Sequence, residues 1–270
     1  MVADHTPFRI DHDFHLHSRL STCSRDPEQT TQRLLRYAEE NGFEKIVLTD
    51  HFWDSAVPGA SQWYCPQDFA WISQVLPLPQ SDRVSFLFGA ETDMDAALTL
   101  GVSDERWDAF SFVVIPTTHL HFRGFTITHE DAETAQGRAN AWIRRLDSLL
   151  SRDLPFHKIG IAHLACSLIA PDTETYRQVF ELLPEQKLEE LFAECARVGV
   201  GIELNSADMV RITNFGELVL RIFRIAKDKG CKFYYGSDSH QTHKLVGVDC
   251  HTTAVIEQLR LTEGDKFHIR

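Results

Sequence analysis

Short apolar stretches alternate with longer segments of helical periodicity along the whole chain. The apolar stretches are rich in β-branched and aromatic residues, which is the pattern of buried strands. Seven strands are predicted, at residues 8–14, 45–48, 84–88, 110–115, 159–162, 200–204 and 232–235. Between them, the spacing of apolar residues predicts helices at residues 27–40, 139–150, 184–198 and 217–229.

The first predicted helix carries the clearest boundary signals. Pro27 follows Asp26 and suits the first helical turn, and Gly42 is suited to end the helix. Two long segments, residues 52–79 and 120–136, are predicted to be loops or short irregular helices. Long loops in a compact α/β domain are more often functional than idle, so we expect the substrate pocket there, with stacking surfaces from aromatic residues. These aromatic residues are Trp53, Trp63, Tyr64, Phe122 and Phe125.

The alternation of strands and helices predicts an α/β fold built from βα units around parallel strands. A length of 270 residues suits one large α/β barrel, so residues 1–270 are expected to form a single domain. Hydrophobic residues make up 43% of the chain and charged residues 24%. These ordinary globular values exclude a disordered or fibrous protein.

The charge and cysteine content narrow the partners and the compartment. With 27 basic and 39 acidic residues the formal charge is −12, and no basic run offsets it. An extended nucleic acid or an anionic membrane surface is therefore not expected as a partner. No apolar run approaches the length of a membrane span, and the first residues lack the pattern of a secretory signal. The six cysteines form no C-x-x-C pair, which favours a cytoplasmic protein with reduced thiols.

Histidine is abundant, with 14 residues, and several histidines stand where the predicted strands end. In a parallel barrel or sheet, all strands end on one face, so side chains at these ends are expected to meet. Residues two apart on a strand share a face, so His15 with His17, and Asp238 with His240, can each direct two ligands at one place. Metal-binding side chains follow all seven strands: His15 and His17, His51, Glu91, His119 and His121, His163, Glu203 and Asn205, and Asp238 and His240.

These motifs, in their order along the chain, resemble those of the PHP (polymerase and histidinol phosphatase) family. The motifs are His15-Leu16-His17-Ser18, Thr49-Asp50-His51, Gly89-Ala90-Glu91, His119, Ala162-His163, Glu203-Leu204-Asn205-Ser206 and Gly236-Ser237-Asp238-Ser239-His240. The resemblance covers nearly the whole chain. It implies a distorted, TIM-like (β/α)7 barrel and a centre of two or three Zn, Mn or Fe ions that hydrolyses phosphoesters.

The resemblance also implies a ligand set. One metal would be held by His15, His17, Glu91 and Asp238, and Glu91 would bridge to a second metal held by His119 and His163. A third metal would be held by His51 and His240. Among these residues, His51, Glu91, Asp238 and His240 are expected to be catalytic.

At three positions the sequence allows more than one ligand or role. Members with three metals usually offer a His or Asp about six residues after the H-x-H motif, and here Cys23 occupies that place, with Asp26 slightly beyond. A Cys23 thiolate would suit zinc and not manganese, while Asp26 could reach in instead, or the third site could be weak or empty. His119 is preferred over His121 for its place in the motif. Glu203 is expected either to contact the substrate, to coordinate a metal or to support a ligand.

The predicted chemistry is hydrolysis of a small phosphate monoester by a hydroxide that bridges the metals. The resemblance implies L-histidinol phosphate as the leading substrate. Basic residues next to the strand ends are candidates for phosphate contacts, and Arg123 is preferred because its loop resembles that of histidinol phosphatases. The others are Arg19, Arg25 and Lys158, and Asn205 is expected to contact the substrate. The alternatives are a phosphodiesterase acting on nucleotides or cyclic phosphates, and a non-catalytic metal-binding or regulatory protein. The motifs of serine hydrolases, P-loop NTPases, dinucleotide enzymes and cysteine-dependent phosphatases do not occur.

Overall fold

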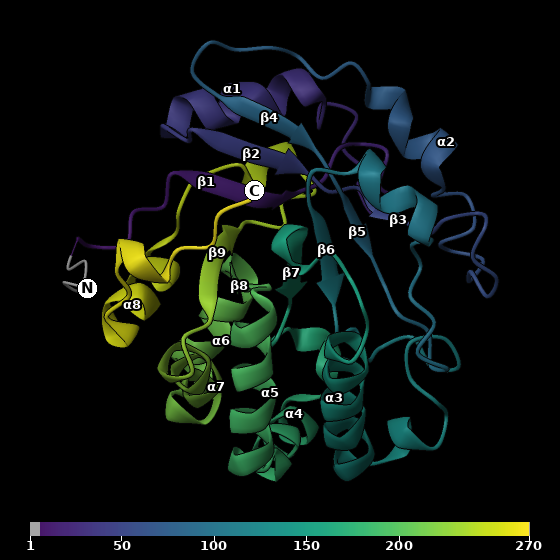
Figure 1. Cartoon of the computed structure of the whole chain (residues 1–270), viewed down its shortest axis with the longest axis vertical. Helices are drawn as coiled ribbons and strands as arrows, with labels where there is room; N and C mark the ends of the chain where they lie inside the picture. The colour runs from purple at the N-terminus through teal and green to yellow at the C-terminus, as the bar shows by residue number, and fades with distance from the viewer. Residues whose placement is uncertain (1–5, 270) are drawn as a thin grey trace.

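The computed structural model describes residues 6–269. Its strands β1–β9 form two sheets, and all neighbouring strands within each sheet run parallel (Figure 1). The smaller sheet has the order β1-β2-β4, with β1 at His12–Leu16, β2 at Lys45–Leu48 and β4 at Ser85–Phe88. The larger sheet has the order β3-β5-β6-β7-β8-β9, with strands at His51–Phe52, Ala90–Thr92, Val113–Pro116, Ile159–Ala162, Gly201–Asn205 and Lys232–Gly236.

Two of the seven predicted strands, at residues 45–48 and 84–88, are each continued after a break by a second short strand that was not predicted. β2 continues after a short gap as β3, and β4 continues as β5, so that both lines of chain leave the smaller sheet and enter the larger one. Gly89 stands at the second break, where an added Cβ would lie only 2.8 Å from Val47 Cγ1. A residue without a side chain is therefore needed for this close approach.

The two sheets close into a ring between the first and last strands. Asp238 N donates to His15 O at 2.8 Å, and His17 N donates to Ser239 O at 3.2 Å. Counting each broken strand once, seven lines of parallel chain surround a common interior. The distorted barrel implied by the resemblance is confirmed.

Side chains from several strands fill the barrel interior, as in other closed α/β barrels. Phe14, Val47, Phe112, Ala162 and Tyr234 belong to one buried apolar cluster. In β1, an irregularity in register between Asp13 and Leu16 lets the chain depart from strict alternation. As a result, Phe14 packs in the interior while the next residue, His15, faces the ligand cluster described below.

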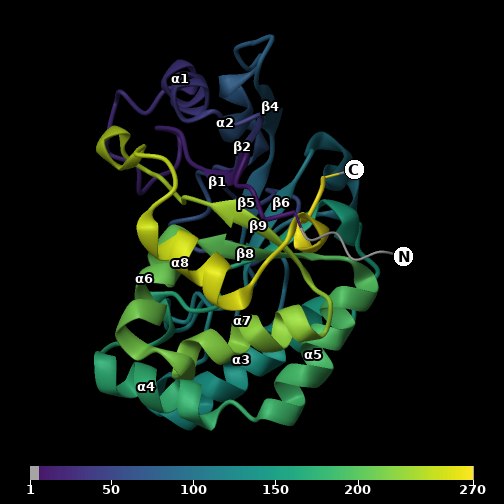
Figure 2. The same cartoon turned by 90° about the vertical axis from the view of Figure 1, so that its left-hand side faces the viewer.

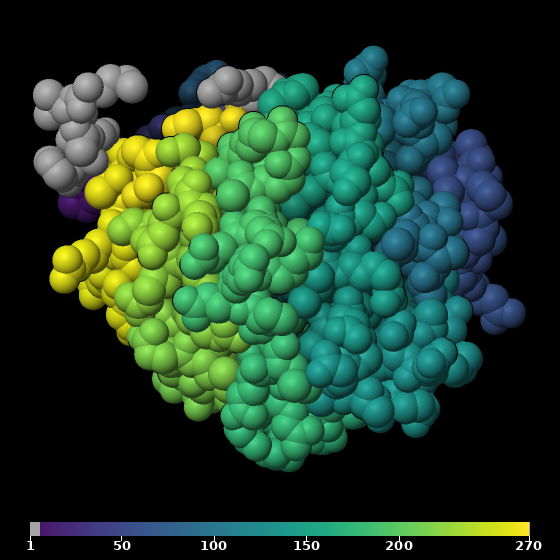
Figure 3. All heavy atoms as spheres, turned by 60° about the horizontal axis from the view of Figure 1, so that its bottom comes forward, coloured from purple at the N-terminus to yellow at the C-terminus, as the bar shows by residue number. Residues whose placement is uncertain are grey.

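Helices cover both sheets. α1 (Thr31–Asn41) packs on the smaller sheet, and α3 (Ala135–Leu150) and α5 (Glu185–Val198) lie beyond the larger one (Figure 1). Seen from that side, the segments from α3 onward form a continuous surface that runs from teal to yellow (Figure 3). The remaining α-helices are α2 (Phe69–Ile72), α4 (Thr173–Leu182), α6 (Ser206–Phe215), α7 (Glu217–Asp228) and α8 (Cys250–Leu259), with α6 beside α8 (Figure 2). Within residues 6–269, no helix combines the length and apolar character needed to cross a membrane.

Several predicted boundaries are wrong by a few residues. β1 starts at His12 instead of residue 8, and α1 starts at Thr31 instead of Pro27. The start of α1 is fixed by Thr30, whose side chain accepts a hydrogen bond from Arg33 N. The prediction from Pro27 therefore placed the start of this helix too early. In the same way, Thr134 caps α3, which starts at Ala135, four residues before its predicted start. α4, α6 and α8 were not predicted from the sequence.

Candidate metal centre

A cavity of about 590 Å³ opens at the carboxyl ends of the strands. Its walls include residues from the loops after β1, β3, β6, β7 and β9 and from α6. Seven of the residues predicted to bind metal line this cavity: Cys23, His51, Glu91, His119, His163, Asp238 and His240. The predicted convergence of strand ends therefore takes place at one cavity.

The innermost cluster is formed by His15, His17, Glu91 and Asp238. His15 Nε2 and His17 Nε2 lie 3.1 Å apart. Glu91 Oε2 lies 3.5 Å from His15 Nε2 and 3.4 Å from His17 Nε2, and Asp238 Oδ1 lies 3.5 and 3.2 Å from the same two atoms. These separations are those of donor atoms arranged around one ion.

The two carboxylates also reach His163. Its Nε2 atom lies 3.6 Å from Glu91 Oε1 and 3.6 Å from Asp238 Oδ2. The ring of His119 stacks on that of His163, with centroids 5.0 Å apart, whereas His121 is exposed at the cavity wall. Glu91 and Asp238 are thus placed to bridge two ions, and the geometry favours His119 over His121 as a ligand.

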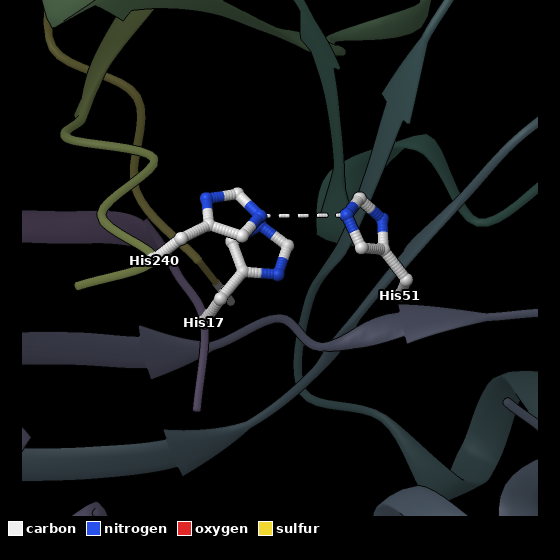
Figure 4. Close-up of side chains that lie close together, drawn as sticks. All are labelled: His17, His51 and His240. Atoms are coloured by element: carbon white, nitrogen blue, oxygen red, sulfur yellow. Dashed lines mark hydrogen bonds between the residues drawn. The ribbon is translucent and has the colours of Figure 1, made fainter. Parts of the chain in front are cut away.

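A third group lies toward the cavity rim. His17, His51 and His240 bring ring nitrogens within 4.8 Å of one another, and the rings of His17 and His240 are stacked (Figure 4). His51 Nε2 is 3.4 Å from His240 Nε2 and 3.2 Å from Cys23 Sγ. By contrast, Asp26 Oδ2 accepts hydrogen bonds from Thr242 N and Thr242 Oγ1, which turn it away from this group.

No family model and no curated protein matches the chain. Solved structures do match it in fold, among them the following two. The histidinol phosphate phosphatase of Lactococcus lactis, whose structure holds zinc, L-histidinol and phosphate, is 16% identical, with 96% of this chain and 98% of that chain covered at a TM-score of 0.62. The histidinol phosphatase candidate of Listeria monocytogenes is 15% identical, with 87% and 97% covered at a TM-score of 0.62. The chain has the histidinol phosphatase fold. This is the PHP fold that the sequence motifs indicated.

In this histidinol phosphatase fold, buried polar residues hold the candidate ligands in place. His15 Nδ1 bonds to Glu203 Oε1 at 2.6 Å, and the second oxygen of Glu203 accepts from His163 N. His17 Nδ1 bonds to Ser21 Oγ, which itself donates to Asp50. Such contacts fix the ring orientation and leave the Nε2 lone pair facing the cluster. Of the three roles open for Glu203, the geometry therefore favours support of a ligand.

His119 is held by a buried ion pair. Its Nδ1 atom lies 3.1 Å from Asp93 Oδ2, and the other carboxylate oxygen of Asp93 accepts from Arg145 Nη2 at 2.6 Å. Arg145 is fully buried and also donates to the backbone carbonyls of Thr117, Met94 and Thr126. Because a guanidinium in the core needs all of these partners, Arg145 fixes both Asp93 and the histidine beyond it.

The electrostatics of the cluster suit a cation. Burial alone would raise the pKa of Glu91, but the charges of His51 and His15 hold that pKa well below its usual range. Among the described residues, no side chain or backbone group donates a hydrogen bond to Glu91 Oε1, Glu91 Oε2 or Asp238 Oδ1, although all three atoms are buried. A buried carboxylate without donors is costly unless a cation compensates it. The residues present therefore fit divalent metal ions.

The backbone at two candidate ligands is strained. His163 has a φ of 62° and Asp238 a φ of 52°, both in the left-handed region that residues other than glycine seldom adopt. Each residue directly follows or lies close to the end of its strand, β7 or β9. Strain of this kind persists where surrounding structure enforces it, and it is concentrated at functional sites.

The residues predicted to bind the substrate are mostly placed elsewhere. Arg123 pairs with Glu133 at 2.7 Å, and Arg19 is exposed at a different hollow, beside Thr31. Lys158 precedes β7, so it lies at the amino end of that strand, where it donates to Trp107 O. Proximity in sequence to His163 was misleading because the strand separates the two residues. Asn205 caps α6 through its Oδ1 atom, and Arg25 is exposed outside the cavity lining.

Two basic residues in the cavity lining were missed. Arg211 enters from α6, with its guanidinium 5.8 Å from the centre of the Tyr176 ring, and Lys244 enters from the loop after β9. A helix prediction for residues 206–215 would have placed Arg211 in the second turn after a strand end. No comparable signal marks Lys244, which ends a 3₁₀ helix of three residues, Thr242–Lys244.

Proposed function

We propose that the chain hydrolyses a small phosphate monoester with two or three divalent metal ions, and that L-histidinol phosphate is its leading substrate. The observation that carries the proposal is Glu91. Both of its carboxylate oxygens are buried without a hydrogen-bond donor from the described residues, and imidazole nitrogens of four histidines lie within 2.8–3.6 Å of them. The zinc, L-histidinol and phosphate in the structure of the Lactococcus lactis protein support the same reading.

The ligand assignment follows the three groups described above. His15, His17, Glu91 and Asp238 would hold one ion, and the two carboxylates would share a second ion with His163 and His119. His51 and His240 would hold a third ion. Bound divalent ions supply a water of lowered pKa and neutralise the charge that develops on phosphate during displacement. Histidine and carboxylate ligands accept zinc, manganese and iron, and we propose that zinc, manganese or iron occupies the sites of the first two ions.

The chain's own residues would bind the phosphate and the rest of the substrate. Arg211 and Lys244 are the cations of the cavity lining and face the negatively charged group of the substrate. Trp63, Tyr64 and Phe122 supply flat apolar walls for a small organic moiety. A cavity of about 590 Å³ suits a small phosphorylated molecule.

We also propose that the protein works in a reducing compartment, the cytoplasm. All six cysteines are unpaired in the structure, including three that are buried. Three are exposed, and they would be liable to oxidation in an extracellular setting.

The decisive experiment measures phosphate release by the zinc- or manganese-loaded protein. The substrates are L-histidinol phosphate, p-nitrophenyl phosphate and bis(p-nitrophenyl) phosphate, a diester. We expect hydrolysis of the monoesters, its loss in His15→Ala and Asp238→Ala, and full activity in His157→Ala, an exposed histidine at the amino end of β7. Only trace metal in the purified protein, or hydrolysis that survives in both ligand variants, would show the proposal to be wrong. Hydrolysis of the diester alone would favour the phosphodiesterase alternative.

A second comparison tests the phosphate contacts. Arg211→Ala is expected to raise the KM for the monoester, while Arg123→Ala should leave it unchanged because Arg123 pairs with Glu133 away from the cavity. A raised KM in Arg123→Ala, with an unchanged KM in Arg211→Ala, would instead assign the phosphate contact to Arg123.

A further inference from the structure

A second hollow, of about 280 Å³, lies at the start of α1. Its lining shares no residue with the lining of the metal-centre cavity. Among the described residues that line it, Arg19 is the one charged residue and none is acidic. The exposed guanidinium of Arg19 forms no ion pair or hydrogen bond with any residue from 6 to 269. The charge of the hollow therefore favours an anion.

The first turn of α1 adds two free hydrogen-bond donors. Thr30 Oγ1 accepts from Arg33 N, and Thr30 O accepts from Leu34 N. The two earlier amide groups, Thr31 N and Gln32 N, meet no acceptor in the part of the chain that the structure describes, and both residues line the hollow. The turn also contains no acidic residue. Free amide groups at the start of a helix attract negative charge.

An independent feature of the hollow is a buried acceptor without a donor. Gln29, which belongs to the lining, is fully buried, and its Nε2 donates to His17 O and Ser239 O, both at 3.0 Å. These bonds fix the amide, because a flipped amide would place Oε1 against two carbonyl oxygens. Oε1 therefore faces away from them, and it is buried without a hydrogen-bond donor from the described residues. Such an acceptor is costly unless a bound group donates to it.

A complementary ligand must both accept and donate hydrogen bonds. Its negative charge would face Arg19 and the two free amide groups of α1, and a hydroxyl group would donate to Gln29 Oε1. Inorganic phosphate meets both demands, because its ions near neutral pH keep at least one P–OH group. Sulfate has no hydroxyl group, and a phosphate monoester, whose second pKa is about 6, has lost its own by about pH 8.

We propose that the hollow at the start of α1 binds inorganic phosphate as hydrogen phosphate. The hollow lies outside the metal centre, so this inference goes beyond the proposed function and does not depend on it. Phosphate is also the product of the proposed reaction, so the hollow is a second place at which the product binds.

Equilibrium dialysis with radiolabelled inorganic phosphate tests the site in the zinc-loaded, full-length protein. We expect two bound equivalents, one at the metal centre and one in the hollow. Arg19→Ala should weaken the second equivalent by roughly 10- to 100-fold, because a charged hydrogen-bond donor is lost. Arg25→Ala is the matched control, since Arg25 is exposed in the same loop between β1 and α1 and lies outside both linings. Binding that Arg19→Ala leaves unchanged overturns the proposal.

A proline substitution tests the contribution of the helix. Proline lacks the N–H group and is tolerated at the first position of a helix, and the extended backbone of Thr30, with φ −91° and ψ 159°, suits a residue before proline. Thr31→Pro should therefore weaken the same equivalent by roughly 10-fold. Ala135→Pro, the same change at the first position of α3, should leave phosphate binding unaltered. Full binding in Thr31→Pro overturns the proposal.

Competition identifies the ligand. In Asp238→Ala, which is expected to lose the metal-centre equivalent, excess sulfate or p-nitrophenyl phosphate at about pH 8 should leave phosphate bound, because neither can donate to Gln29 Oε1. Displacement by either ion as effective as that by unlabelled phosphate overturns the proposal. A single wild-type equivalent that Arg19→Ala weakens and Asp238→Ala keeps would count against the proposed function and support the hollow. A single equivalent that Asp238→Ala removes would do the reverse.

Discussion

Gly236, at the end of β9, is expected to be essential for the orientation of His15. A Cβ atom at this position would lie 2.7 Å from His15 Cβ and 3.0 Å from Glu203 Cδ, and closer still to Glu203 Oε1. Gly236 does not have a positive φ, so alanine is compatible with its backbone. The effect of Gly236→Ala therefore comes from this crowding alone.

The size of the effect follows from the contact distances. Carbon atoms pack at about 3.5 Å or more, so the structure must yield by about 0.8 Å near His15. A displacement of that size lengthens the bond of 2.6 Å between His15 Nδ1 and Glu203 Oε1 to beyond normal hydrogen-bond length. Loss of a partner that orients a metal-bound histidine costs roughly 10- to 100-fold in metal affinity. We expect zinc affinity to fall by this factor.

The assay is competition for zinc with a chromophoric chelator, combined with thermal unfolding of the metal-free protein. Gly199→Ala is the matched control, because an added Cβ there meets no atom within 4 Å. Its φ of 78° makes alanine destabilising by about 1 kcal/mol, but zinc affinity should not change. Unchanged zinc affinity in Gly236→Ala would refute the role given to the contact between Glu203 and His15.

Four further outcomes are expected. Arg145→Met removes the partner of buried Asp93 and should lower the free energy of unfolding by about 3–5 kcal/mol in urea titrations; a loss under about 1 kcal/mol would contradict the role of the pair. Phe112→Ala empties part of the barrel interior and should cost about 3–5 kcal/mol by the same measurement, unless the interior collapses around it. Zinc at 100 times its Kd should add about 2.7 kcal/mol to stability, reversibly with chelator, and an unshifted unfolding curve would exclude a folded-state site. Burial would lower the pKa of His51, but Glu91 raises this pKa to about 10. At pH 7 zinc must therefore displace a proton from His51, and zinc affinity should rise with pH. Calorimetry in buffers of different ionisation enthalpy measures the proton release, and binding without proton release would contradict the raised pKa.

The order of the strands and the candidate ligands could be predicted because both depend on local patterns. An apolar stretch followed by His, Asp or Glu marks a strand end in a parallel fold, and this signal identified residues such as His15, Glu91 and Asp238. The register irregularity in β1 was not visible, because it depends on how β1 pairs with β2. The same holds for the two broken strands, since transfer between sheets is set by packing across the barrel.

The substrate-binding residues were predicted less well, because charge near a strand end in sequence does not determine where a side chain points. Arg123 is paired with a glutamate ten residues away, and Lys158 lies at the wrong end of its strand. Arg145 reaches Asp93 across 52 residues, a contact that no local pattern reveals. Cys23 was one of three alternatives in the sequence; in the structure Asp26 accepts a hydrogen bond from Thr242, and Ser24 ties the cysteine loop to His240 O.

The closure of the ring between β1 and β9 has a consequence for how the protein folds. The candidate ligands extend from His15 to His240, so the centre depends on contacts between residues more than 200 positions apart. Contacts of such long range form late, because the entropy of closing the intervening chain must be overcome first. During synthesis, His15 and His17 emerge long before their partners on the last strand, and metal can bind at the complete site only after the barrel has closed. Metal binding would then stabilise a fold that the barrel core has already formed.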